Sequence, residues 1–81
     1  MEERLNAYLE FLKSLKLRDN TIKRYIYAVK RFITSIDKNI DRFTTFELNT
    51  YLQSIDNIEV RNRTGFTIVK FAKDMLDFNP N

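Results

Sequence analysis

The stretch from Asn20 to Ile36, NTIKRYIYAVKRFITSI, constrains the fold more than any other part of the chain. Its apolar residues recur at steps of three and four, which is the period of an amphipathic α-helix; they are Ile22, Tyr25, Ile26, Val29, Phe32, Ile33 and Ile36. The opposite face carries four basic residues and no acid, so its positive charge is uncompensated within the stretch. A helix with these two faces needs a hydrophobic core on one side and, on the other, either water or an anionic partner. We interpret that partner as DNA.

The size and composition of the chain indicate one small helical domain. A domain of 81 residues buries only about 60% of its unfolded surface, so a deep catalytic cavity is not expected. The 43% hydrophobic and 14% aromatic content suffices for a compact core. One glycine and one proline in the whole sequence favour long helices over a turn-rich β fold.

Several classes of protein are excluded by what the sequence lacks. No apolar run approaches the ~20 residues of a membrane span, so we expect no membrane association. The first 15 residues do not resemble a signal peptide, because acids and a lysine interrupt their apolar run. Without cysteine the chain can form neither disulfides nor thiolate metal sites. We therefore expect a cytoplasmic protein.

Apolar periodicity predicts three further helices. The first runs from about Glu2 to Lys16, and its inward residues are Leu5, Tyr8, Leu9, Leu12 and Leu15. The third runs from about Thr45 to Ser54 behind a capping box, in which Thr44 caps the helix and Glu47 reaches back. The fourth runs from about Glu59 to Asp77, and the residues predicted to face inward are Val60, Thr64, Ile68, Phe71, Ala72, Met75 and Leu76.

The connections between these helices are short. Leu17-Arg18-Asp19 makes the first two helices neighbours in space. The cap of the second helix is ambiguous: Asp19 or Asn20 suits the position by residue type, and Arg18 would allow a hydrophobic staple. Asp37–Phe43 is predicted to be a surface loop held by Ile40 and Phe43, and Asn79-Pro80 to end the last helix.

The fourth helix contains Gly65, the only glycine in the chain. A glycine inside a helix costs about 1 kcal/mol relative to alanine. It either admits the close approach of another backbone or is simply tolerated. On the outer side of this helix, Phe66 lies among basic residues, and we expect a neighbouring loop or domain to cover part of it.

Enzyme chemistry finds little support in the residues. There is no His and no Cys, so the usual general bases, thiol nucleophiles and zinc ligands are missing. One glycine cannot form a phosphate-binding loop. The carboxylates are scattered and show no spacing typical of an acid–base pair or a metal site. We expect no catalysis by this chain alone, no metal and no cofactor.

Several motifs in order resemble the N-terminal core-binding domain of tyrosine recombinases, the phage-integrase and Xer-like enzymes. The motifs are Leu17, Asn20-Thr21, Tyr25, Lys30-Arg31, Phe32-Ile33, then Phe43-Thr44-Thr45-Phe46-Glu47-Leu48, and finally Phe71 and Asn79-Pro80. The chain departs from the family pattern at Arg18, where a serine is common, and at Gly65, where a large apolar residue is usual. The resemblance implies an all-α fold, a compact four-helix orthogonal bundle of the SAM-like core-binding class.

The resemblance also implies a function. Residues 1–78 would be a core-binding domain that forms half of a clamp around duplex DNA, and residues 79–81 would begin a linker to a C-terminal catalytic domain. That catalytic domain and other recombinase protomers on the DNA would be partners. The second and fourth helices would face the DNA, with these residues on the interface: Thr21, Lys23, Arg24, Tyr27, Lys30, Arg31, Arg61, Arg63, Lys70 and Lys73.

The expected roles differ among these residues. Thr21, in the first turn of its helix, would hold a phosphate with the free backbone amides around it. Lysines would act as point charges on phosphates. The arginine forks of Arg24, Arg31 and Arg63 suit either phosphates or guanine edges. Tyr27 would donate to a phosphate or pack on a sugar.

Two other functions remain open from the sequence. One is a helical protein-interaction module whose basic faces meet an acidic protein. The other is a stand-alone DNA-binding regulator that places its third helix in the groove. The third helix argues against this, because Glu47 is its only charged residue and it has few donors for phosphates and bases.

Overall fold

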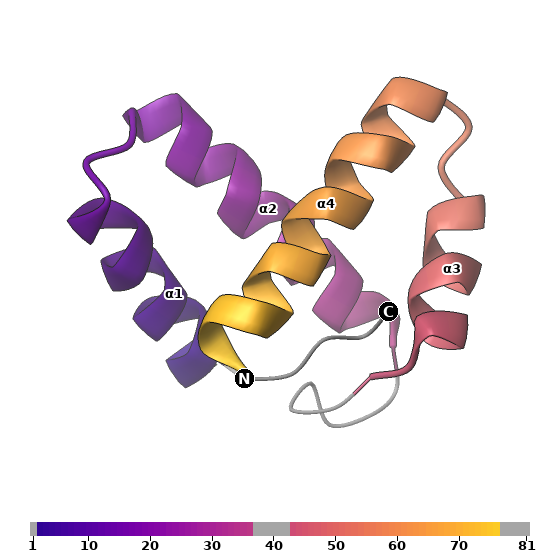
Figure 1. Cartoon of the computed structure of the whole chain (residues 1–81), viewed down its shortest axis with the longest axis horizontal. Coiled ribbons are helices and arrows are strands. Elements are labelled where there is room, and N and C mark those ends of the chain that lie inside the picture. Colours follow the sequence, from indigo (N-terminus) through magenta and orange to yellow (C-terminus); the bar gives the residue numbers. More distant parts are fainter. Residues whose placement is uncertain (1, 37–42, 77–81) are drawn as a thin grey trace.

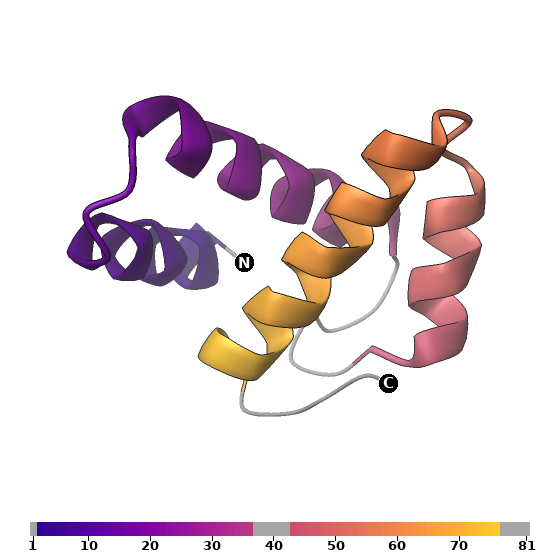
Figure 2. The ribbon, with the colours of Figure 1, turned by 45° about the horizontal axis from the view of Figure 1, so that its top comes forward.

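The computed structural model describes residues 2–36 and 43–76, and these residues form four α-helices and no strand (Figure 1). The helices are α1 (Glu2–Ser14), α2 (Asp19–Ser35), α3 (Thr45–Gln53) and α4 (Ile58–Met75). α4 packs against the other three helices, and α2 packs against α1 and α4. Figure 2, turned from the first view, shows α4 crossing α2, with α1 and α3 on opposite sides of the pair. The predicted all-α fold of four helices is confirmed.

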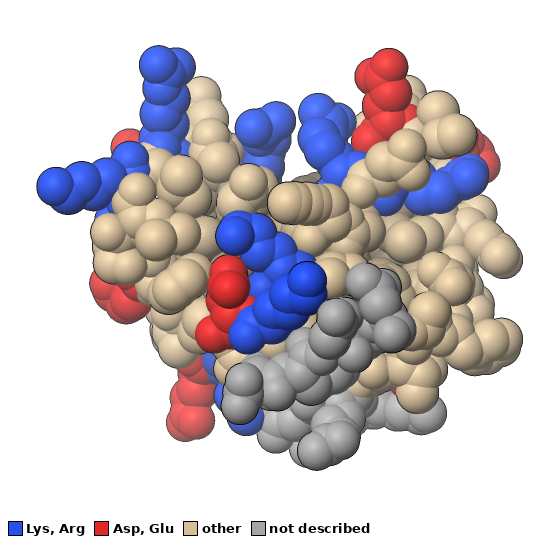
Figure 3. All heavy atoms as spheres, in the orientation of Figure 1, with Lys and Arg blue, Asp and Glu red and all other residues tan. Residues whose placement is uncertain are grey.

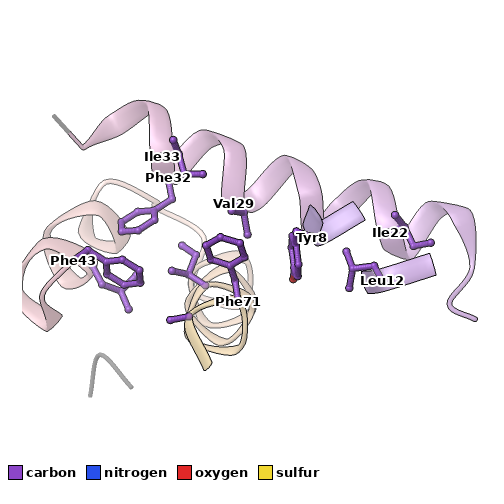
Figure 4. Close-up of a cluster of buried hydrophobic side chains, with 11 residues drawn as sticks. Tyr8, Leu12, Ile22, Val29, Phe32, Ile33, Phe43 and Phe71 are labelled. Carbon is purple, nitrogen blue, oxygen red and sulfur yellow. The ribbon is translucent and has the colours of Figure 1, made fainter. Parts of the chain in front are cut away.

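Apolar side chains from every helix meet in one core where α2 and α4 cross (Figure 4). Tyr8 of α1 packs edge-on against Phe71 of α4, with ring centroids 4.9 Å apart. Phe32 of α2 makes similar contacts with Phe43 at 4.8 Å and with Tyr51 at 5.3 Å. The buried side chains among the described residues are all aliphatic or aromatic, and none carries a formal charge. Burial of the apolar face of α2 leaves its other face for solvent or a partner, as predicted.

Side-chain caps define where α3 and α4 begin. The Glu47 amide donates to Thr44 Oγ1 at 3.1 Å, and the Thr44 amide donates to Glu47 Oε1 at 2.8 Å, which completes the predicted capping box. At α4, Asn57 Oδ1 accepts from the amides of Glu59 and Val60. Both caps satisfy amides that a helix start otherwise leaves without a partner.

The end of α1 differs from the sequence prediction. The helix stops at Ser14, and the amides of Leu15 and Lys16 then donate to carbonyls three residues back. Lys16 adopts a left-handed backbone with φ of 58°, which turns the chain toward α2. Leu15 is therefore 45% exposed, and the prediction that it faces the core is wrong; Leu17 packs against the core instead.

Gly65 accommodates a side chain from α3. A Cβ atom at Gly65 would lie 3.0 Å from Cδ1 of Leu52. The close neighbour is thus a side chain, whereas one of the two sequence interpretations had proposed a backbone. Val60, also predicted to face inward, is 36% exposed near the start of α4. Of the loop predicted at Asp37–Phe43 only the buried Phe43 lies within the described residues, and Asn79-Pro80 lies outside them.

Candidate nucleic-acid interface

The outer face of α2 presents the predicted basic residues to solvent. Lys23, Arg24, Lys30 and Arg31 are all exposed, and Thr21 is partly buried. None of these four basic residues forms an ion pair with any described residue. Figure 3 shows Lys and Arg side chains projecting from the upper edge of the molecule, over α2 and the first part of α4. Because no described acid neutralises this face of α2, its charge is available to an anion.

A groove of about 520 Å³ lies between this face and α4, and Tyr51, Ser54 and Ile55, from α3 and the turn after it, complete its lining. Its α2 wall includes Arg24, Tyr27 and Arg31, and its α4 wall includes Arg63, Phe66 and Thr67. The structure therefore brings three of the predicted arginines, two from α2 and one from α4, onto one concave surface. No Asp or Glu is among the groove's lining residues.

Arg31 is held in place by its neighbour on α2. Its Nη1 donates a hydrogen bond to the Tyr27 hydroxyl at 2.8 Å, and its guanidinium carbon lies 5.6 Å from the centre of the Tyr27 ring. The hydrogen bond to Tyr27, together with the nearby Tyr51 hydroxyl, raises the pKa of Arg31 above its usual value. Arg31 thus stays positively charged and points along the groove side of α2.

The start of α2 has no side-chain cap. Arg18 occupies the N-cap position, and its side chain makes no capping hydrogen bond, which resolves the ambiguity left by the sequence. The amides of residues 19–21 have no hydrogen-bond partner among the described residues. Such amides attract phosphate oxygens, although the Asp19 carboxylate in the same turn weakens that attraction.

The other predicted residues of α4 are arranged differently. Lys70 forms an ion pair with Asp74 at 3.7 Å and remains 44% exposed in its side chain, while Lys73 is exposed. Arg61 projects toward α3: its Nε and Nη2 donate to the carbonyl of Ile55 at 3.0 and 2.7 Å. Arg61 lines a second hollow, beside Leu48 and Gly65, and is not brought together with the arginines of the groove.

The groove also contains aromatic residues that the sequence did not place there. Phe66, expected to be partly covered, is 60% exposed on the α4 wall. Tyr25, interpreted from the sequence as a core residue, and Tyr51 are partly buried and line the same groove. A signal existed for Phe66, since Arg63, Phe66 and Lys70 are spaced to share one helix face. No sequence pattern indicated that this face would oppose Tyr27.

The described residues offer neither a cluster of metal ligands nor a membrane-spanning helix. No group of three or more acidic, histidine or cysteine side chains within residues 2–36 and 43–76 is arranged to hold a metal ion. Among the helices of that part of the chain, none is long and apolar enough to cross a membrane.

Comparison with known proteins identifies the family. Residues 5–78, which include all of the groove, match the family model described as "Phage integrase, N-terminal SAM-like domain". No curated protein and no solved structure matches the chain significantly. The family match agrees with the four helices and with a recombinase-associated role. The chain belongs to the family of phage integrase N-terminal SAM-like domains.

Proposed function

We propose that this chain is the DNA-binding N-terminal domain of a tyrosine recombinase, and that it forms half of a clamp around duplex DNA. In this proposal residues 1–78 are the DNA-binding unit, and residues 79–81 lead into a catalytic domain. Strand cleavage belongs to that second domain, so the present chain is not catalytic by itself. Its partners are double-stranded DNA, the catalytic domain and further protomers on the same DNA.

One observation carries the proposal: the outer face of α2 presents four exposed basic residues that form no ion pair with any described residue, and Arg63 of α4 lies across the groove from two of them. A phosphate backbone recognised by several such charges releases counterions, and this release supplies most of the non-specific affinity. Lysines at the edge supply point charges, while the arginine forks suit bidentate contacts.

Neutralising the α2 face tests the proposal. The parent chain should bind duplex DNA with a Kd of roughly 10⁻⁴ to 10⁻⁶ M at physiological salt. The quadruple variant Lys23→Gln, Arg24→Gln, Lys30→Gln, Arg31→Gln should lose this binding and keep its helical circular dichroism, because all four side chains are exposed. If the folded quadruple variant binds DNA as tightly as the parent does, the basic face of α2 is not the surface that binds DNA.

A separate observation tests the domain organisation. If the chain is part of a recombinase, the coding frame continues past residue 81 into a segment with the arginines, histidines and tyrosine of a catalytic domain. A stop codon directly after Asn81 would contradict that organisation. The affinity measurement would then be the only test of whether this domain binds duplex DNA.

A further inference from the structure

Two exposed aromatic side chains line the α2–α4 groove, and phosphate contacts account for the Tyr27 hydroxyl but not for the Phe66 ring. Tyr27 is 61% exposed and belongs to α2, whereas Phe66 is 60% exposed and belongs to α4. Hydrogen bonds to phosphate and sugar come from charged and polar side chains, tyrosine included, and not from phenylalanine. A phenylalanine open to water on a face that binds only phosphates would gain nothing from that partner.

The groove combines these rings with charge. Arg24, Arg31 and Arg63 line it, and none of the three forms an ion pair with a described residue. The partly buried rings of Tyr25 and Tyr51 line the same groove. An occupant that matches this lining must carry negative charge together with flat, weakly polar surface.

Duplex DNA does not present that combination to the groove. Its bases are stacked inside the helix, so the aromatic rings of the groove can meet only sugars and base edges, and no base face is open to stack on them. An unpaired strand does present it, because every unstacked base offers an aromatic face beside its phosphate. Proteins that bind single strands pair aromatic side chains with a positively charged groove in this way.

We propose that the α2–α4 groove holds unstacked bases of a DNA strand, with the aromatic side chains against the bases and the arginines on the adjoining phosphates. The inference rests on the proposed DNA-binding function and deepens it, since it names the form of DNA that fills the groove. Locally unpaired DNA therefore binds more tightly than the same sequence fully paired.

The test compares two labelled DNAs of equal length by fluorescence anisotropy. One is a fully paired duplex, and the other contains a central run of mismatched bases. The parent should bind the mismatched DNA at least about fivefold more tightly, the smallest gain expected for one base on an aromatic ring. Phe66→Ala should remove this preference, so that the variant binds the mismatched and the fully paired DNA with equal affinity.

Phe46 supplies the matched control. It is 77% exposed on α3 and is not among the groove's lining residues. Phe46→Ala should therefore keep both affinities, and circular dichroism should show both variants folded. Equal affinity of the parent for the two DNAs would overturn the proposal, as would a Phe66→Ala variant that keeps the preference.

The outcomes separate this inference from the proposed function. If the chain binds paired duplex with no preference for mismatched DNA, the inference is wrong and the proposed function is still supported. Binding to mismatched DNA alone supports the groove proposal and contradicts duplex clamping.

A short peptide of alternating Glu and Phe serves as competitor in a second experiment. If it displaces the mismatched DNA at lower concentration than an unlabelled single strand does, the groove is a protein-docking site and the proposal is wrong.

Discussion

Arg31 and Tyr27 lie one turn apart on α2, and the Arg31 guanidinium donates a hydrogen bond of 2.8 Å to the Tyr27 hydroxyl. Both side chains are exposed, so water competes for this bond and it adds little to stability. What the bond does is limit the positions that Arg31 can take above the groove. A side chain that is already placed loses less freedom when it meets a phosphate.

The first prediction concerns this pair. Tyr27→Phe removes the hydroxyl and keeps the ring, so it should change the free energy of unfolding by less than about 0.5 kcal/mol. Affinity for duplex DNA should fall about two- to tenfold, as expected for the loss of one hydrogen bond. Urea unfolding and anisotropy titration check the two parts. An unchanged affinity would mean that the pair does not position Arg31 for DNA.

The second prediction concerns pH. Burial raises the pKa of the Tyr8 hydroxyl above its usual value of 10.0, with smaller contributions from Tyr25 and Asp74. The folded chain therefore holds this proton more tightly than the unfolded chain does. The stabilisation is fully present below pH 10 and is lost as the pH rises above 10, by at most about 1.4 kcal/mol per pH unit.

Tyr8→Phe isolates this effect from the titration of other groups. The free energy of unfolding, measured in urea at pH values of about 8 and about 11, should fall less in the variant than in the parent. The difference between the two falls is the contribution of Tyr8. An equal fall in both proteins would show that Tyr8 titrates alike in the folded and unfolded chains.

The third prediction concerns Gly65 and Leu52. Alanine is favoured over glycine in a helix by about 1 kcal/mol, but a Cβ at Gly65 would lie 3.0 Å from Leu52 Cδ1. The Leu52 side chain is flexible and partly buried, so it can shift to make room for the new methyl group, but this shift has a cost. Gly65→Ala should therefore stabilise the parent by less than about 1 kcal/mol. In a Leu52→Ala background the same substitution should contribute about 1 kcal/mol. Equal effects in both backgrounds would mean that the contact imposes no cost.

Much of the fold follows from the sequence because its signals are local. The three- and four-residue spacing on α2 identifies Ile22, Val29, Phe32 and Ile33 as buried, and all four are. The Thr44–Glu47 capping box involves residues three apart, so its sequence pattern determines its geometry. Leu15 was misplaced because a left-handed residue at Lys16 ends the helical repeat before the apolar pattern ends.

The site was less predictable because it depends on how α2, α3 and α4 meet. The charge on α2 is visible in the sequence, but its approach to Arg63 and Phe66 exists only after packing. Arg61 and Arg63 look equivalent in the sequence because they are only two positions apart. On a helix, however, residues two positions apart point in different directions. Arg61 binds the carbonyl of Ile55 between α3 and α4, a contact that helix periodicity cannot indicate.

The salt dependence of duplex binding tests the central claim, that the basic face of α2 binds the DNA backbone. With six or more phosphate contacts, affinity should fall by roughly 10³ between 50 and 200 mM salt. Lys23→Gln with Lys30→Gln should make the slope of log K against log salt shallower by about two. The matched control, Lys13→Gln with Lys16→Gln, removes the same charge from exposed positions near the end of α1 and should keep the parent slope. Equal slopes in the two double variants, or a parent affinity that salt does not change, would contradict the account.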